Sequence, residues 1–214
     1  MFAYCLNNPV TGYDPTGMVN AEGLAVGLAL IGLGALLIAA TVLTAGAASP
    51  LVATLGTAAC SAVGYAALQT GTVVATAAYE ETPIVIDVTA TNGHTHNRDG
   101  YSYVIDFETC TIETYYHHGV TTSSNYGYTY GVGHVFNYDG PEDYGGHFVD
   151  AGGSFTYNGI DYGVDICTDP TRLGDNGATA ILATVGVSFP TTPKPFPLSG
   201  GYDYYVPVSY ISWR

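Results

Sequence analysis

Two histidines near the middle of the chain, His94 and His96, are spaced so that they could act together. Alternate residues of an extended segment project to the same side, and two imidazoles placed in this way can ligate a metal ion. Asp87, Asp99 or Asp106 could add a carboxylate. The stretch TNGHTHNRDG is rich in turn-forming residues, however, so a solvated loop is the favoured alternative. We predict no metal and no cofactor, and we keep His94 and His96 as the candidates for catalysis.

Other catalytic signatures are missing from the sequence. It contains neither a G-x-S-x-G nucleophile elbow nor a G-x-x-x-x-G-K-[ST] phosphate loop. His117 and His118 are neighbours in a predicted strand, so they face opposite sides and cannot serve one site. Whether the chain is an enzyme stays open, as does a disulfide between two of its cysteines in an oxidising compartment. The four cysteines, of which the last two could pair, are Cys5, Cys60, Cys110 and Cys167.

Charge divides the chain into parts. With 18 acidic and 4 basic residues the formal net charge is −14, which argues against nucleic acid as a partner because phosphates need cations. Residues 23–79 contain no Asp, Glu, Lys or Arg, and the composition changes near Glu80 and Glu81. We therefore expect three parts: a short lead over residues 1–20, an apolar part over 21–79, and an acidic part over 80–214.

The apolar part predicts two helices, over residues 22–46 and 51–78, with Pro50 at the break between them. Each helix exceeds the roughly 20 apolar residues that cross a bilayer, so we expect a transmembrane hairpin. The helices have no flanking Lys or Arg, which normally fix the orientation of a membrane helix, and this weakens the prediction. The alternative is a hairpin buried in a larger assembly. Small residues at helical spacing would let the two backbones pack closely. They are Gly23, Gly27, Gly56, Cys60 and Gly64.

The acidic part predicts antiparallel β structure rich in Gly and Tyr, closed as a barrel or folded as a sandwich. Short links, such as the Asn158-Gly159 turn, favour a meander. The whole chain is thus α+β, a hydrophobic helical hairpin before about eight strands. An outer-membrane barrel would fit the strand number, but the many acids in strands and loops disfavour it. The expected strands are 84–90, 101–107, 111–117, 126–137, 146–157, 160–167, 178–189 and 204–213.

The first residues contain a dense motif. The phrase YCLNNPV over residues 4–10, followed by DPTG over residues 14–17, resembles the end of the core of RHS/YD-repeat proteins. The resemblance implies a large β-shell that is followed by a variable C-terminal module, usually a toxin. It also implies self-cleavage at this motif by aspartates. Asp14, Pro15 and Gly17 match the motif, and Met18 stands where Leu is usual, so the cut would follow Met18.

The same resemblance places the apolar part in a functional context. Gly/Ala-rich hydrophobic segments in such modules are thought to help cross a target membrane. We therefore expect a secreted effector toxin of bacterial competition, which acts by membrane insertion, permeabilisation or translocation of the β domain. Its expected partners are the RHS shell, the target-cell membrane and an immunity protein. Two alternatives remain: an enzymatic toxin of unknown reaction, and a non-catalytic module that binds a ligand or the shell.

Overall fold

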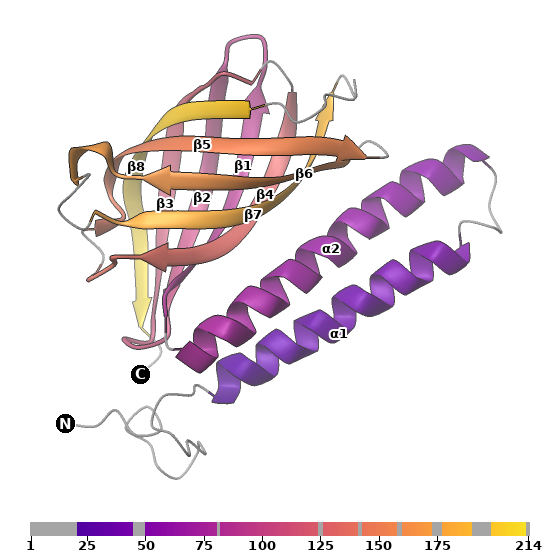
Figure 1. The fold of residues 1–214 in the computed structure, drawn as a ribbon, viewed down its shortest axis with the longest axis horizontal. Coiled ribbons are helices and arrows are strands. Elements are labelled where there is room, and N and C mark those ends of the chain that lie inside the picture. The colour runs from indigo at the N-terminus through magenta and orange to yellow at the C-terminus, as the bar shows by residue number, and fades with distance from the viewer. Residues whose placement is uncertain are drawn as a thin grey trace.

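The computed structural model describes residues 21–44, 50–80, 82–123, 126–140, 143–157, 160–172, 177–189 and 198–212. Within these ranges two α-helices precede eight strands (Figure 1). The motif residues Asp14, Pro15, Gly17 and Met18 lie outside the described residues. The elements are α1 (Ala21–Thr44), α2 (Pro50–Glu80), β1 (Ile84–Asn92), β2 (Asn97–Asp106), β3 (Thr111–Thr121), β4 (Tyr126–Phe136), β5 (Gly146–Tyr157), β6 (Ile160–Thr168), a 3-10 turn η3 (Pro170–Arg172), β7 (Thr179–Phe189) and β8 (Leu198–Ser212).

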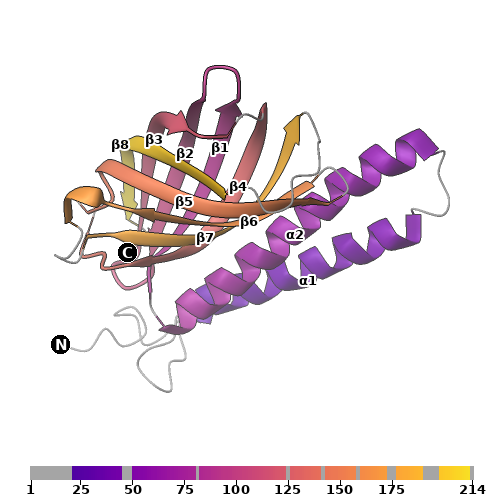
Figure 2. The ribbon, with the colours of Figure 1, turned by 45° about the horizontal axis from the view of Figure 1, so that its top comes forward.

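The strands close into an antiparallel barrel in the order β1-β2-β3-β8-β5-β6-β7-β4 (Figure 2). The predicted antiparallel β domain after two helices is confirmed, and it is a barrel and not a sandwich. The predicted meander is wrong in part. Two runs of consecutive strands, β1–β3 and β5–β7, do form hairpins, but β8 lies between them on one side and β4 on the other. Both β4 and β8 pair only with strands distant in sequence, which no local turn signal specifies.

Alternation along each strand separates the interior of the barrel from its outer wall. In β1, Val85 and Thr89 are buried inside the barrel. Val88, which lies between them in the sequence, faces outward and is exposed. The same period of two runs through β2 and β3, whose burial patterns alternate residue by residue. Side chains of one parity therefore share a single enclosed space.

Aromatic side chains fill one end of this enclosed space. Tyr144, from the segment between β4 and β5, lies 5.4 Å from Tyr115, 5.1 Å from Phe148 and 5.4 Å from Tyr205, measured between ring centroids. All four rings are buried and belong to the main apolar core. We call these four residues the aromatic plug. Because it occupies the end where β1, β3, β5 and β7 begin, the interior at the opposite end is left for polar groups.

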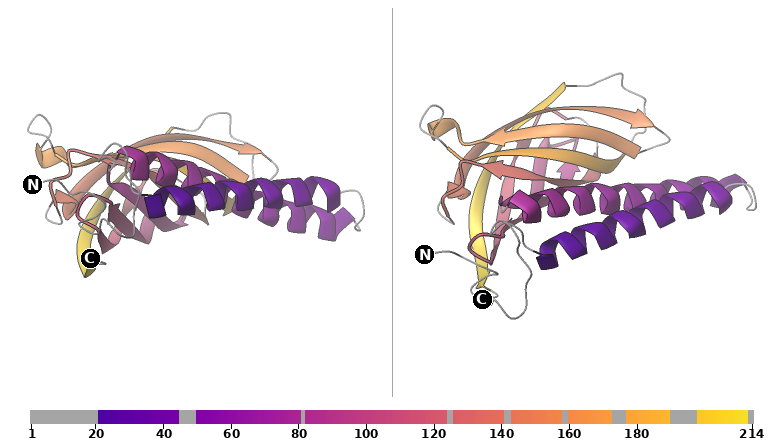
Figure 3. Two further views of the ribbon diagram at one scale, coloured as in Figure 1. Left: turned by 90° about the horizontal axis from the view of Figure 1, so that it is seen from below. Right: turned by 60° about the horizontal axis from the view of Figure 1, so that its bottom comes forward.

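Helix α2 packs against the outside of the barrel, and α1 packs on α2 (Figure 3). The Tyr65 ring meets the Tyr162 ring of β6 at 4.9 Å, and the Thr70 hydroxyl bonds the Tyr130 hydroxyl of β4 at 2.5 Å. Among the helical residues that the structure describes, no helix is both long and apolar enough to cross a membrane.

The link from α2 to β1 is short and hydrogen-bonded at both ends. The Thr82 N–H donates to the Ala77 carbonyl of α2 at 3.0 Å, and the Pro83 carbonyl accepts from the Val135 N–H of β4 at 3.0 Å. The helix therefore continues directly into the barrel wall, close to the composition boundary near Glu80 and Glu81.

Close strand packing predicts different costs at two glycines. A Cβ at Gly133 would collide with the backbone carbonyl of Ile181 on β7, whereas a Cβ at Gly145 would meet only the Tyr115 ring, at 4.0 Å. We expect Gly133→Ala to lower the free energy of unfolding by about 2–3 kcal/mol, because backbone cannot yield as a flexible side chain can. Gly145→Ala is the matched control and should change it by less than about 0.5 kcal/mol. Denaturant unfolding of the full chain measures both, and equal effects would contradict the packing described.

Candidate functional site

The interior beyond the aromatic plug holds a cavity of about 190 Å³. Residues from all eight strands line it, including the hydroxyl-bearing Thr129 and Ser154. Its remaining polar lining is dominated by carboxylates. The Asp, Arg and His side chains that line it are those of Asp87, Arg98, His117, Asp150, Asp161, Asp165 and Asp203.

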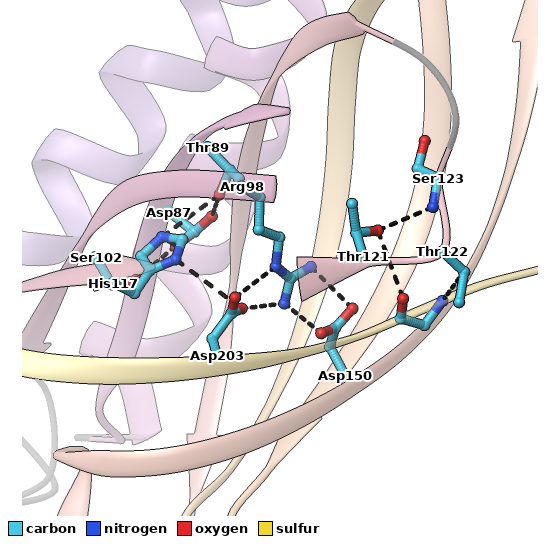
Figure 4. Close-up of polar contacts among 11 residues, drawn as sticks. Asp87, Thr89, Arg98, Ser102, His117, Thr121, Thr122, Ser123, Asp150 and Asp203 are labelled. Carbon is cyan, nitrogen blue, oxygen red and sulfur yellow. Dashed lines mark hydrogen bonds and ion pairs between the residues drawn. The ribbon is translucent and has the colours of Figure 1, made fainter. Parts of the chain in front are cut away.

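Arg98 of β2 is the centre of an ion-pair network (Figure 4). Its Nε donates to Asp203 Oδ1 of β8 at 2.7 Å, and one terminal nitrogen donates to Asp150 Oδ2 of β5 at 2.9 Å. The other terminal nitrogen pairs with both carboxylates. The guanidinium fork thus meets two carboxylates through three nitrogens, a geometry that the single nitrogen of a lysine cannot reproduce. Burial raises the pKa of Asp150 despite the facing Arg98 charge.

His117 of β3 extends the network toward β1. Its Nε2 lies 3.0 Å from Asp87 Oδ1, and its ring stacks on Tyr205 at 4.8 Å. Burial alone would raise the pKa of Asp87, but hydrogen bonds from His117, Ser102 and Thr89 outweigh it, so the pKa is lowered. The Nδ1 atom of His117 is buried, lies 3.9 Å from Asp203 Oδ2, and has no hydrogen-bond partner among the described residues.

Glycines make room for these side chains. A Cβ at Gly119 would collide with the Asp203 carboxylate, and a Cβ at Gly152 would collide with the Asp165 carboxylate. Because each of these glycines lies directly opposite the polar residue on the neighbouring strand, the missing side chain is what allows the polar one to bend across it. Four such cross-strand pairs are Gly100 with His117, Gly119 with Asp203, Gly201 with Asp150, and Gly152 with Asp165.

Asp165 of β6 differs from the other cavity carboxylates. It makes no hydrogen bond or ion pair with the residues that the structure describes, whereas Asp161 accepts a hydrogen bond from Thr156. Burial, together with repulsion from the Asp150 charge, raises the pKa of Asp165 to about 6. A carboxyl group with a pKa near neutrality can take up or release a proton under ordinary conditions.

The outer wall of the barrel has the opposite character. In the described strands, every Asp, Glu and Arg side chain faces the interior except that of Asp99, which lies near the β1–β2 turn and accepts from the Tyr116 hydroxyl at 2.7 Å. Large apolar and aromatic side chains are exposed on this wall instead. They include Val88, Tyr101, Tyr103, Val120, Tyr128, Val149, Phe155, Val164, Ile166, Ile181, Val187, Tyr202, Tyr204 and Val206.

The two predicted catalytic histidines lie away from the cavity. His94 and His96 are exposed in the β1–β2 turn, where His96 has a positive φ of 56° and its Nδ1 lies 3.1 Å from the Ser123 carbonyl. Within the described residues, no group of three or more His, Cys, Asp or Glu side chains could hold a metal ion. The structure brings together His117 of β3, Arg98 of β2 and aspartates from four further strands. Sequence reasoning named Asp87 only as a possible carboxylate beside His94 and His96, and it missed the others. The placement of His117 and His118 on opposite faces of one strand was the signal that could have found this site.

The predicted helix-packing residues have different surroundings. Gly27 lies against Ala75 of α2, and Gly64 lies against Gly34 of α1, so both are at the contact between the helices. Gly23 is buried, Cys60 is exposed, and Gly56 belongs to α2. The two cysteines left open as a pair, Cys110 and Cys167, are both free and buried thiols.

Neither protein-family models nor curated protein sequences gave a match to this chain. Function is therefore argued from the geometry.

Removal of the Arg98 charge should destabilise the barrel strongly. In Arg98→Met, Asp150 and Asp203 would stay buried without a counterion, and we expect the free energy of unfolding to fall by about 3–5 kcal/mol. Arg98→Lys keeps the charge but loses the guanidinium fork. Its free energy of unfolding should therefore lie between those of Arg98→Met and the wild type. Denaturant unfolding at neutral pH measures the series. If Arg98→Met matched the wild type, the ion pairs would have no structural weight.

Asp165 should make stability depend on pH. Its folded pKa of about 6 lies above the usual value for an unfolded aspartate, so stability falls as the pH rises through this window. Asp165→Asn should therefore stabilise the chain by about 2 kcal/mol at pH 7.5 and have little effect near pH 4. Denaturant unfolding at both pH values tests this, with the exposed Asp99→Asn as the control. A gain that is independent of pH would contradict the assignment.

Proposed function

We propose that this chain is the membrane-inserting C-terminal effector module of an RHS-type protein, and that lipid hydrocarbon contacts the outer wall of its barrel. The distribution of charge carries the proposal. Barrels that face water have charged residues on their outer faces, whereas in membrane barrels lipid-facing apolar residues alternate with interior polar ones. The described strands follow the second pattern. The acids that seemed to disfavour a membrane barrel from the sequence point inward.

Strand length and closure agree with a lipid environment. The strands of this barrel have 9 to 15 residues, and a tilted strand needs about 9–11 residues to cross the hydrocarbon core. A closed barrel also has no free edge, so backbone N–H and C=O groups bond within the sheet. Such satisfaction matters in hydrocarbon, where each unpaired backbone group costs several kcal/mol.

On the exposed side of α2, too, polar groups are hydrogen-bonded within the protein. The hydroxyls of Thr72 and Thr76 are exposed, yet each donates to the backbone carbonyl four residues earlier, at 2.9 and 2.8 Å. Thr70, on the side of α2 that faces the barrel, also donates to the carbonyl four residues earlier, that of Ala66, at 2.7 Å. Threonines that satisfy their own hydroxyls suit a helix surface without water. We infer that the helices, whose only charged residues are Glu22 near the start of α1 and Glu80 at the end of α2, enter the bilayer together with the barrel wall.

The N-terminal phrase gives this module its context. A chain that follows an RHS-type core would be delivered from the shell to a target-cell membrane, with an immunity protein protecting the producer. Because the aromatic plug closes one end of the barrel, insertion is better supported than an open pore. Permeabilisation, or translocation of the barrel, would need a further rearrangement.

A second function, ligand binding or catalysis inside the barrel, is favoured by one observation. The cavity holds Asp165, a carboxyl group with a pKa of about 6 that forms no hydrogen bond or ion pair with a described residue. A group of this kind can bind a cation or act as a general acid or base.

Flotation with vesicles of neutral phosphatidylcholine tests insertion. The full chain should float with the vesicles, because apolar burial needs no lipid charge. Val164→Lys places a charge at an outward position that is 53% exposed. We expect it to reduce the bound fraction at least tenfold, since a lysine near the midplane of a barrel costs about 2–4 kcal/mol.

Thr95→Lys is the matched control, because it adds the same charge to the exposed β1–β2 turn. It should float like the wild type, and circular dichroism should show that both variants are folded. A wild-type chain that stays at the bottom of the gradient would overturn the proposal, as would equal flotation of both variants. Release of a trapped dye tests permeabilisation separately.

A further inference from the structure

We propose that the barrel cavity is a binding site for a small organic cation that carries primary ammonium groups. The site lies inside the barrel, so it does not depend on what surrounds the outer wall. Charge is the first argument. Five aspartates line the cavity against one arginine, and the hydrogen bonds of Arg98 are taken up by Asp150 and Asp203. The remaining carboxylates have no guanidinium or ammonium group among the described residues that line the cavity.

Asp165 is the predicted anchor for the ammonium group. Its carboxylate lines the cavity and forms no hydrogen bond or ion pair with the described part of the chain. Gly152 lies opposite it on β5, where any side chain would collide with the carboxylate. Gly152 thus makes room for a carboxylate that has no hydrogen-bond donor and no ion-pair partner among the described residues. An ammonium group supplies both the missing charge and the missing donors.

His117 provides a second and independent observation. It is only 1% exposed, and its Nδ1 has no hydrogen-bond partner in the described residues. In the neutral tautomer that donates Nε2–H to Asp87, Nδ1 carries a lone pair that faces Asp203 Oδ2 at 3.9 Å. Two acceptors at this separation can share one N–H donor group placed about 2.9 Å from each. The inner end of the cavity therefore also requires a hydrogen-bond donor.

The lining distinguishes between classes of cation. The described carboxylates do not converge into a metal site, which disfavours a divalent ion. Quaternary ammonium groups need an aromatic cage, but the aromatic rings that line the cavity, Tyr144 and Tyr205, pack against each other in the plug. Hydroxyls such as those of Ser154 and Thr184 offer acceptors along the wall. A short primary amine or diamine fits this lining best.

Calorimetric titration of the full chain at pH 7.5 tests the site with 1,4-diaminobutane as the probe. We expect saturable binding that 1,4-butanediol, of the same length but without charge, does not reproduce. Calcium chloride should not displace the diamine. The proposal would be overturned by absence of diamine binding, by equal binding of the diol, or by displacement with calcium.

Variants locate the binding. Asp165→Asn should weaken diamine binding at least tenfold, and we expect this variant to fold because it removes an unneutralised charge. Asp99→Asn, which changes the one outward-facing carboxylate of the strand residues that the structure describes, should bind like the wild type. Equal affinity of the two variants would overturn the assignment of the site to Asp165. Vesicle flotation should be unchanged in Asp165→Asn, so failure of this site and failure of membrane insertion give different results.

Discussion

The ion pairs of Arg98 with Asp150 and Asp203 are the interaction on which the architecture depends. Arg98 belongs to β2, Asp203 to β8 and Asp150 to β5, so one guanidinium connects strands of both three-stranded runs across β8. Neither run could close into a barrel alone. Burying a charge is costly unless it is paired, and the pairing of Arg98 found here also joins the two halves of the sheet.

Strand alternation then has two consequences for one sequence. It collects charged and hydroxyl side chains in a small interior, and it leaves the outer wall almost free of charge. The glycines opposite the polar residues make the first consequence sterically feasible. The second gives the molecule a surface that water solvates poorly. The polar cavity and the apolar outer wall therefore both result from the alternation of side chains along each strand. A shift of one residue in register would place the polar side chains outside and the apolar ones inside.

Much of the local structure could be predicted from the sequence, because turn residues and alternation are local signals. The strand predicted over residues 146–157 has those bounds in the structure, and the other strands differ mainly at their ends. Strand order was not predictable in the same way, since β4 and β8 pair over long distances in sequence. The cavity was missed for a related reason. Alternation separates the two faces of a strand without saying which face is enclosed. The acids in the strands therefore argued against a wall that faces lipid. For the same reason His117 was not connected with Asp87 or Asp203.

The short link between α2 and β1 has a mechanical consequence. Three residues separate Glu80 from Ile84, a span of at most about 14 Å even when fully extended. Within this span Thr82 bonds back to α2, and Pro83 bonds to β4. A force that pulls the helices would thus act directly on β1 and on its seam with β4. The helices and the barrel must therefore move together, or the pairing between β1 and β4 must break first.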